Sequence, residues 1–198
     1  MNKQKLLLCK IASCISAKKF KKLQELLSEC KNNSIPSQLI YETILQSYLF
    51  NGFPAAINAL TIFKKVYGNE SLLKGENFSV QKFEKRGKTN LRFVYGNKTE
   101  KLVSLMQSLS EEFLQWMIIE GYGKVKGRKW LTLKDRELLN VAMLSTNYYE
   151  DQLKAHIRGA LFTNNTVQEI TESINSTTEY NLKTNIKKAI RLINEQIV

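Results

Sequence analysis

The feature that most constrains the fold is the spacing of apolar residues, which recur every three or four positions, whereas strict alternation of apolar and polar residues is scarce. Spacings of three and four place side chains on one face of an α-helix. Two such stripes lie in the second half of the chain. They consist of Leu102, Leu105, Met106, Leu109, Phe113, Trp116 and Met117, and of Leu138, Val141, Ala142 and Ser145. The pattern predicts an all-α protein in which helices pack on helices.

Two helix starts are marked by a capping pattern. Thr132 is followed by Asp135 and Thr166 by Glu169. At this spacing the threonine hydroxyl accepts from a free backbone amide, and the acid favours the positive end of the helix. We therefore expect helices to begin directly after Thr132 and Thr166.

Glycine and proline divide the chain further. Gly52 and Pro54 predict that one helix ends near Phe50 and that the next starts with proline in its first turn. Gly68 would end that helix, and the apolar period then fails until about residue 100. We predict a first unit at 1–67, a basic polar linker at 68–100 in which only 91–95 could form a strand, and a second unit at 101–198.

The two predicted units resemble each other. Asn32–Ile35 in the first unit matches Asn164–Val167 in the second, 132 residues later, and each follows an amphipathic segment that contains Leu23 or Leu153. We interpret this as a tandem repeat of one helical unit, the first copy being truncated at its start.

The cysteine content argues against a disulfide-stabilised secreted protein. Cys9, Cys14 and Cys30 are odd in number and not closely paired. The N-terminal apolar run, Leu6–Cys9, is far shorter than the roughly 20 residues that span a membrane. We expect a soluble cytoplasmic protein without a membrane partner.

The chain carries a formal net charge of +12, with its tightest cluster at Lys18, Lys19, Lys21 and Lys22. Such a surface attracts polyanions at low salt, but a solvated lysine-rich helix face gives the same pattern. No recognised nucleic-acid motif accompanies the charge, so nucleic acid is not the expected partner.

Several segments give the chain a family resemblance. In the second unit they are Glu120–Val125 with Arg128, Leu131–Leu139, Gln152–Leu161 and Asn165–Ile170, and in the first unit Gly52–Leu60. On these residues the sequence resembles the carboxymuconolactone decarboxylase family, which shares its fold with alkylhydroperoxidase D-type proteins. The resemblance implies an all-α bundle that assembles into homo-oligomers, commonly trimers or hexamers.

The chain departs from the peroxidase members of that fold. Their pattern places Glu137 at the family glutamate and His156 at the family histidine, but it puts Tyr149 and Gln152 where two thiols are expected. There is no C-x-x-C motif, so thiol peroxidase chemistry is not expected. In the first unit, Leu26 takes the place of His156, which leaves one histidine-bearing site per chain.

The remaining candidate chemistry is proton transfer. If the helix that carries His156 and the helix before it, which carries Glu137, form an antiparallel hairpin, the Glu137 carboxylate could reach the His156 imidazole, hold one tautomer and raise the basicity of the ring. Tyr149, Gln152 and His156 share one helical stripe, so the first two would line the pocket. Arg128, Arg136 or Arg158 could bind a substrate carboxylate. No metal or other cofactor is required.

Three functions follow from these features. The first is a decarboxylase or other lyase that acts on a small anionic lactone or organic acid, with His156 and Glu137 as catalytic residues. The second is a non-catalytic helical oligomer that has lost this chemistry, since a buried histidine paired with a structural carboxylate would look the same. The third is a basic module that binds polyanions through Lys18–Lys22 and the basic linker.

Overall fold

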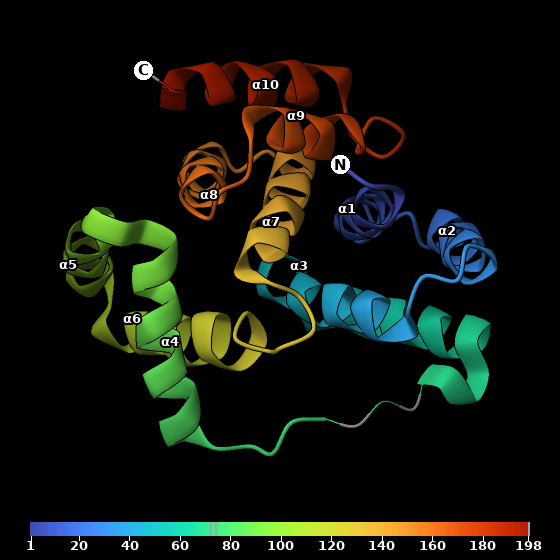
Figure 1. Cartoon of the computed structure of the whole chain (residues 1–198), viewed down its shortest axis with the longest axis horizontal. Helices are drawn as coiled ribbons and strands as arrows, with labels where there is room; N and C mark the ends of the chain where they lie inside the picture. The colour runs from blue at the N-terminus through green and yellow to red at the C-terminus, as the bar shows by residue number, and fades with distance from the viewer. Residues whose placement is uncertain (72, 74, 198) are drawn as a thin grey trace.

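The computed structural model describes residues 1–71, 73 and 75–197, and every regular element within them is a helix (Figure 1). The elements are α1 (Lys3–Ser16), α2 (Phe20–Asn32), α3 (Ser37–Tyr67), η1 (Gly68–Ser71), α4 (Val80–Tyr95), η2 (Gly96–Lys98), α5 (Thr99–Leu109), α6 (Glu111–Trp116), η3 (Met117–Val125), α7 (Leu133–Asn147), α8 (Glu150–Phe162), α9 (Val167–Asn175) and α10 (Lys183–Ile197). The all-α prediction is confirmed.

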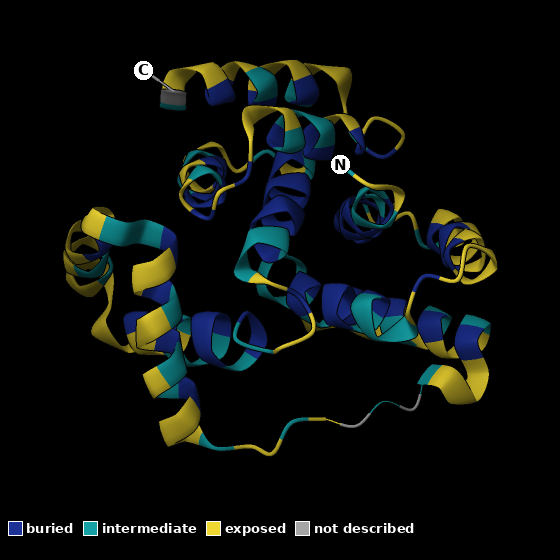
Figure 2. Ribbon diagram, viewed as in Figure 1, coloured by how far each residue is buried: buried dark blue, intermediate teal, exposed yellow. Residues whose placement is uncertain are grey.

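The main core is built around α7. This helix packs against α1, α3, α8, α9 and α10, and it is buried along most of its length (Figure 2). One continuous cluster of buried apolar side chains runs from Leu7 in α1 to Ile193 in α10. The predicted units 1–67 and 101–198 therefore share a core, and their status as separate domains stays a prediction.

The segment predicted as a linker contains a regular helix. Residues 91–95, the candidate strand, form the last turn of α4, so that prediction is wrong. Phe83, Gly87, Leu91 and Val94 are the buried positions of α4, and their spacings of four, four and three are helical. The glycines of this region suggested a loop. Gly87 nevertheless lies inside α4, where the absence of a side chain lets the backbone of Ile118 pack closely against the helix.

Helix α4 packs tightly on η3, a π-helical segment that continues α6. A Cβ atom at Gly87 would lie 2.1 Å from the carbonyl oxygen of Ile118, and one at Gly123 would lie 2.1 Å from that of Phe83. Each helix thus presents a glycine to the backbone of the other. Leu91, Val94, Leu114, Ile118 and Tyr122 form a second apolar cluster at this contact.

We expect Gly123→Ala to lower the free energy of unfolding by about 1–3 kcal/mol, because the added methyl group meets backbone that cannot rotate away. Gly121→Ala is the matched control. A Cβ at Gly121 meets nothing within 4 Å, and removing a helical glycine gains about 0.5–1 kcal/mol. Urea unfolding followed by circular dichroism compares the two variants. Equal midpoints would contradict the close packing of α4 on η3.

The predicted helix boundaries are confirmed where they depend on caps and glycines. The Thr132 side chain accepts from the amide of Asp135, and Thr166 and Glu169 form a reciprocal capping box. Helix α3 is interrupted at Gly52, whose φ of 73° is outside the helical region, and it ends at Gly68.

The two predicted repeats have matching helix bounds. Lys3 and Leu133 start α1 and α7, Phe20 and Glu150 start α2 and α8, and Ser37 and Val167 start α3 and α9, each pair 130 residues apart. The left-handed turn residues follow the same register: Lys18 matches Tyr148, and Ser34 matches Asn164. The structural register thus differs by two residues from the 132-residue spacing of the asparagine pairs. A common origin of the units stays a prediction.

In this register the two units differ at their centres. Leu7 and Leu26 take the places of Glu137 and His156, and both leucines are buried in the apolar core. The first unit is therefore closed by apolar packing where the second unit holds ionisable groups.

Within the part of the chain that the structure describes, no helix combines the length and the apolarity that crossing a bilayer requires. The basic cluster Lys18, Lys19, Lys21 and Lys22 is exposed at the start of α2, and Lys22 forms an ion pair with Glu25.

Candidate active site

The two residues that the sequence singled out are in direct contact. Glu137 lies in the second turn of α7 and His156 lies midway along α8, which follows α7 after a left-handed turn at Tyr148. His156 Nδ1 is 2.6 Å from Glu137 Oε2. Glu137 has no exposed surface, and His156 is 9% exposed. The geometry of the predicted contact is therefore present, whereas its role in catalysis is a proposal.

A third charged residue, Lys126, completes the cluster and was not found from the sequence. Its Nζ lies 2.8 Å from Glu137 Oε1, and the side chain is only 3% exposed. The same Nζ lies 3.9 Å from the centre of the Tyr122 ring. Because η3 is π-helical, the Lys126 amide bonds back to the carbonyl of Gly121, and this wider turn delivers the lysine to the core. No sequence motif marks Lys126 among the many basic residues.

The electrostatics of the cluster keep Glu137 ionised. Burial by itself would raise the pKa of Glu137, but Lys126 and His156 outweigh burial and lower this pKa to about 2. Burial lowers the pKa of Lys126, and Glu137 opposes that change. A carboxylate can only accept, so Nδ1 of His156 carries the hydrogen and donates it to Glu137. The other ring nitrogen, Nε2, is then the atom that can exchange a proton.

The amide of Asn140 joins this cluster to a buried polar chain. Asn140 Nδ2 donates to Glu137 Oε1 at 3.1 Å, and Asn140 Oδ1 accepts from Gln46 Nε2 at 2.7 Å. Gln46 lies on α3, so these buried hydrogen bonds connect the first unit with the second. Gln46 and Asn140 are uncharged, and no sequence pattern indicated either of them.

The polar chain continues to a buried ion pair. Arg136 donates to Gln46 Oε1 and to Glu42 Oε2, both at 2.9 Å, and neither Arg136 nor Glu42 is exposed. Arg128 Nε donates to both oxygens of Glu42 at 2.9 Å. Glu42 therefore holds two arginines that the sequence had suggested as substrate ligands.

The structure does not bring the predicted arginines to His156. Arg136 is enclosed with Glu42, Arg128 is directed toward a separate cavity, and Arg158 is exposed and donates to Gln196 at 2.8 Å. Two of them balance a buried carboxylate and the third faces solvent, and a role in binding a substrate carboxylate stays a prediction for all three.

Tyr149 and Gln152 lie at the surface of the protein. Both are exposed at the beginning of α8, and Tyr149 is 55% exposed. They share a helical stripe with His156, as predicted, but α8 is buried only from Leu153 onward. The first turn of α8 therefore lies outside the core, and the lining of a substrate pocket by Tyr149 and Gln152 stays a prediction.

Aromatic and small residues surround the ionic cluster instead. Phe50 lies edge-on to the imidazole with ring centres 5.7 Å apart, and the hydroxyls of Tyr95 and Tyr122 are 3.0 Å apart. Gly159, one turn after His156, allows Glu137 to approach α8, since a Cβ there would lie 3.0 Å from Glu137 Oε2. His156 lines neither the cavity that contains Arg128 nor the one that contains Phe93.

The three cysteines do not form a redox centre. Cys9, Cys14 and Cys30 are buried and unpaired by disulfides, and burial raises the pKa of each thiol to about 12. A buried thiol of high pKa is a poor nucleophile at neutral pH. Among the described residues, no group of three or more His, Cys, Asp or Glu side chains could hold a metal ion.

These features define an α-helical protein with a thiol-free, buried Lys–Glu–His cluster where the end of η3 meets the packed helices α7 and α8. Residues 111–195, which include the whole cluster, match the model of the carboxymuconolactone decarboxylase family. This segment, less than half of the chain, is what is similar to that family. The match does not extend to the first unit, so the resemblance of Gly52–Leu60 stays a prediction. No curated protein matches the chain significantly.

Proposed function

We propose that the protein is a cofactor-independent lyase of the decarboxylase type that acts on a small anionic lactone or organic acid. The observation that supports it most is the 2.6 Å contact between His156 Nδ1 and a glutamate that Lys126 keeps ionised. This arrangement holds the ring in one tautomer and directs its proton chemistry to Nε2.

In the proposed reaction, the bond between the substrate carbon and its carboxylate breaks and carbon dioxide leaves. The electron pair stays on the substrate as an enolate, delocalised toward the lactone carbonyl. Protonated His156 then transfers the Nε2 proton to the carbon, and the neutral ring regains a proton from water. Glu137 acts as a positioning residue, because it contacts only the far side of the ring.

We expect His156→Gln to lower kcat on lactone acids by about 100-fold or more, since general acid catalysis contributes at least that factor. Lys187→Gln, an exposed change on α10, is the control and should leave kcat unchanged. The measurement is carbon dioxide release from a panel of lactone acids, with circular dichroism to verify folding. Unaltered turnover in His156→Gln would remove this residue from the mechanism.

A second candidate function, a non-catalytic helical oligomer, is favoured by the burial of the cluster and by the absence of His156 from both cavities. Assembly itself remains a proposal. It is supported by exposed apolar side chains on α5 and α6, namely Leu105, Leu109, Phe113 and Trp116. Failure of the wild-type chain to release carbon dioxide from any lactone acid would favour this candidate.

A further inference from the structure

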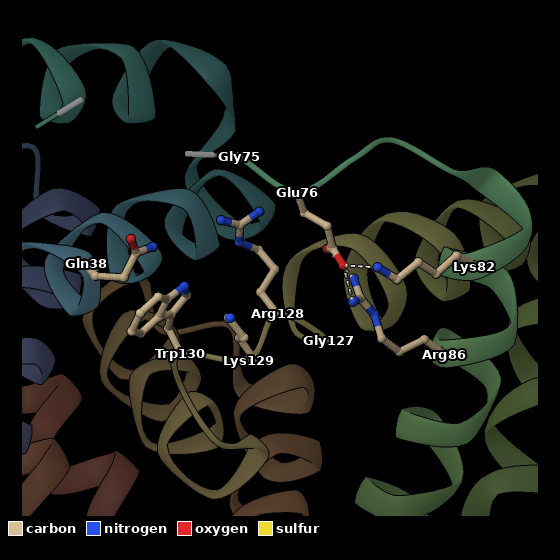
Figure 3. A pocket seen from close by; sticks show the side chains of 9 residues that line it. All are labelled: Gln38, Gly75, Glu76, Lys82, Arg86, Gly127, Arg128, Lys129 and Trp130. Atoms are coloured by element: carbon tan, nitrogen blue, oxygen red, sulfur yellow. Dashed lines mark hydrogen bonds and ion pairs between the residues drawn. The ribbon is translucent and has the colours of Figure 1, made fainter. Parts of the chain in front are cut away.

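A cavity of about 450 Å³ lies apart from the His156 cluster (Figure 3). It is bounded by Gln38 at the start of α3, by Gly75 and Glu76, by α4, and by the segment 127–130 that connects η3 to α7. A volume of this size matches a small-molecule site rather than a single bound water. The proposed lyase function does not account for this cavity.

The lining of the cavity is strongly cationic. Among its described residues are Lys82, Arg86, Arg128 and Lys129, with Glu76 as the one carboxylate. Glu76 accepts from Arg86 through both oxygens, at 2.8 and 2.9 Å, and from Lys82 at 2.6 Å. Two of the four cations are thus paired with Glu76, and the lining keeps a formal excess of three positive charges.

The other two cations face the cavity. Arg128 uses Nε to contact Glu42, but Glu42 is shared with Arg136, and no hydrogen bond within the described residues occupies the terminal nitrogens of Arg128. Lys129 forms no ion pair with any described residue. Figure 3 shows both side chains between Gln38 and Trp130 on one side and Glu76, Lys82 and Arg86 on the other.

The guanidinium groups are held in place before any ligand binds. Arg86 is fixed by Glu76 and by the Gly123 carbonyl, to which its Nε donates at 2.7 Å. Arg128 is fixed by Glu42, and its side chain is only 13% exposed. Pre-ordered donors lose little conformational entropy on binding, and guanidinium groups suit the paired oxygens of carboxylates and phosphates.

Trp130 adds an apolar wall. Its side chain is 50% exposed, and Lys129 Nζ lies 5.3 Å from the centre of its ring. A ligand here can therefore combine contact with an aromatic face and charge-assisted hydrogen bonds. We infer that the cavity is a binding site for a small organic molecule with two or three negative charges, supplied by carboxylate or phosphate groups.

The test measures binding by the fluorescence of Trp130. The chain contains two tryptophans, so Trp116→Phe on the exposed face of α6 leaves Trp130 as the only one. In low-salt buffer we expect citrate, pyrophosphate or both to change this fluorescence saturably, and to bind about tenfold or more tightly than acetate, which carries one charge. The tighter of the two probes identifies the anionic group that the site prefers.

Lys129→Gln in the same background should weaken binding about tenfold, the effect of losing one charge-assisted contact. Lys85→Gln is the matched control, because Lys85 is exposed on α4 outside the cavity lining and the charge change is identical. It should change binding by less than about twofold, as expected for an isolated surface charge.

Three results would overturn the inference. They are the absence of saturable binding by both citrate and pyrophosphate, affinities no higher than that of acetate, or equal losses in Lys129→Gln and Lys85→Gln. Equal losses would show that the probes respond only to the overall charge of +12. Because only binding is measured, the result is independent of whether the chain is a lyase.

Discussion

Glu137→Gln is expected to lower the free energy of unfolding by about 3–5 kcal/mol, because it leaves the ammonium group of Lys126 buried without its counter-ion. Lys126 is 3% exposed and Glu137 is fully buried, so water cannot replace the lost carboxylate. Urea unfolding measures the change. Glu112→Gln, an exposed position at the start of α6, is the control and should alter stability by less than about 0.5 kcal/mol.

A double variant separates the loss of the pair from the loss of one partner. Lys126→Met combined with Glu137→Gln removes both charges, and we expect it to regain most of the stability, since buried ion pairs can be replaced by uncharged groups at little loss. If the double variant were as unstable as the sum of both single variants, Lys126 and Glu137 would not interact as a pair.

The same carboxylate makes the stability of the wild-type protein depend on pH. The pKa of Glu137 is lowered from 4.5 to about 2, so its contribution is fully present above pH 4.5 and is lost as the pH falls toward 2. Glu76 is lowered to about 2 in the same way, through Arg86 and Lys82. Stability should therefore fall across this window in the wild type, and less steeply in Glu137→Gln.

The second large effect is expected at Glu42. Glu42→Gln removes the only carboxylate that contacts Arg136 and Arg128 within the described residues, and Arg136 has no exposed surface. We expect a loss of about 3–5 kcal/mol in the free energy of unfolding. Arginine does not lose its proton, so the buried charge of Arg136 would remain without a counter-ion.

An exposed ion pair provides the contrast for this variant. Glu25 pairs with Lys22 at 3.0 Å on the surface of α2, so Glu25→Gln removes the same charge where water can solvate the lysine. It should cost at most about 1 kcal/mol in urea unfolding. Similar losses in Glu25→Gln and Glu42→Gln would show that burial of the Glu42 cluster is not what makes it important.

Local patterns in the sequence predicted much of the fold. The apolar period identified the helices, and Thr132, Thr166, Gly52 and Gly68 marked boundaries that the structure reproduces. These predictions succeeded because caps and glycine turns depend on residues within one helical turn of each other. Residues 91–95 were wrongly predicted as a strand because the glycines of this region indicated a loop. Gly87 instead lies within α4, where it makes room for the backbone of η3, and this contact is between residues far apart in the sequence.

In the candidate site, too, contacts between neighbouring helices could be predicted from the sequence, whereas contacts between distant segments could not. The pairing of Glu137 with His156 could be predicted because the two residues belong to consecutive helices joined by a short turn. Lys126, Gln46 and Glu42 could not, because they reach the cluster from other elements, and Glu42 meets Arg136 across 94 positions of the chain. The exposure of Tyr149 and Gln152 could not be predicted either, because helical spacing gives the face on which a side chain lies and not how deeply that face is buried.

By itself, therefore, the sequence determined that the chain is helical, where several of its helices begin and end, and which acid faces the one histidine. Only the tertiary structure decided which charges are buried together and which remain open to a ligand, as at Arg128 and Lys129. The physical reason is that helix formation depends on neighbours along the chain, whereas desolvation and charge pairing depend on neighbours in space.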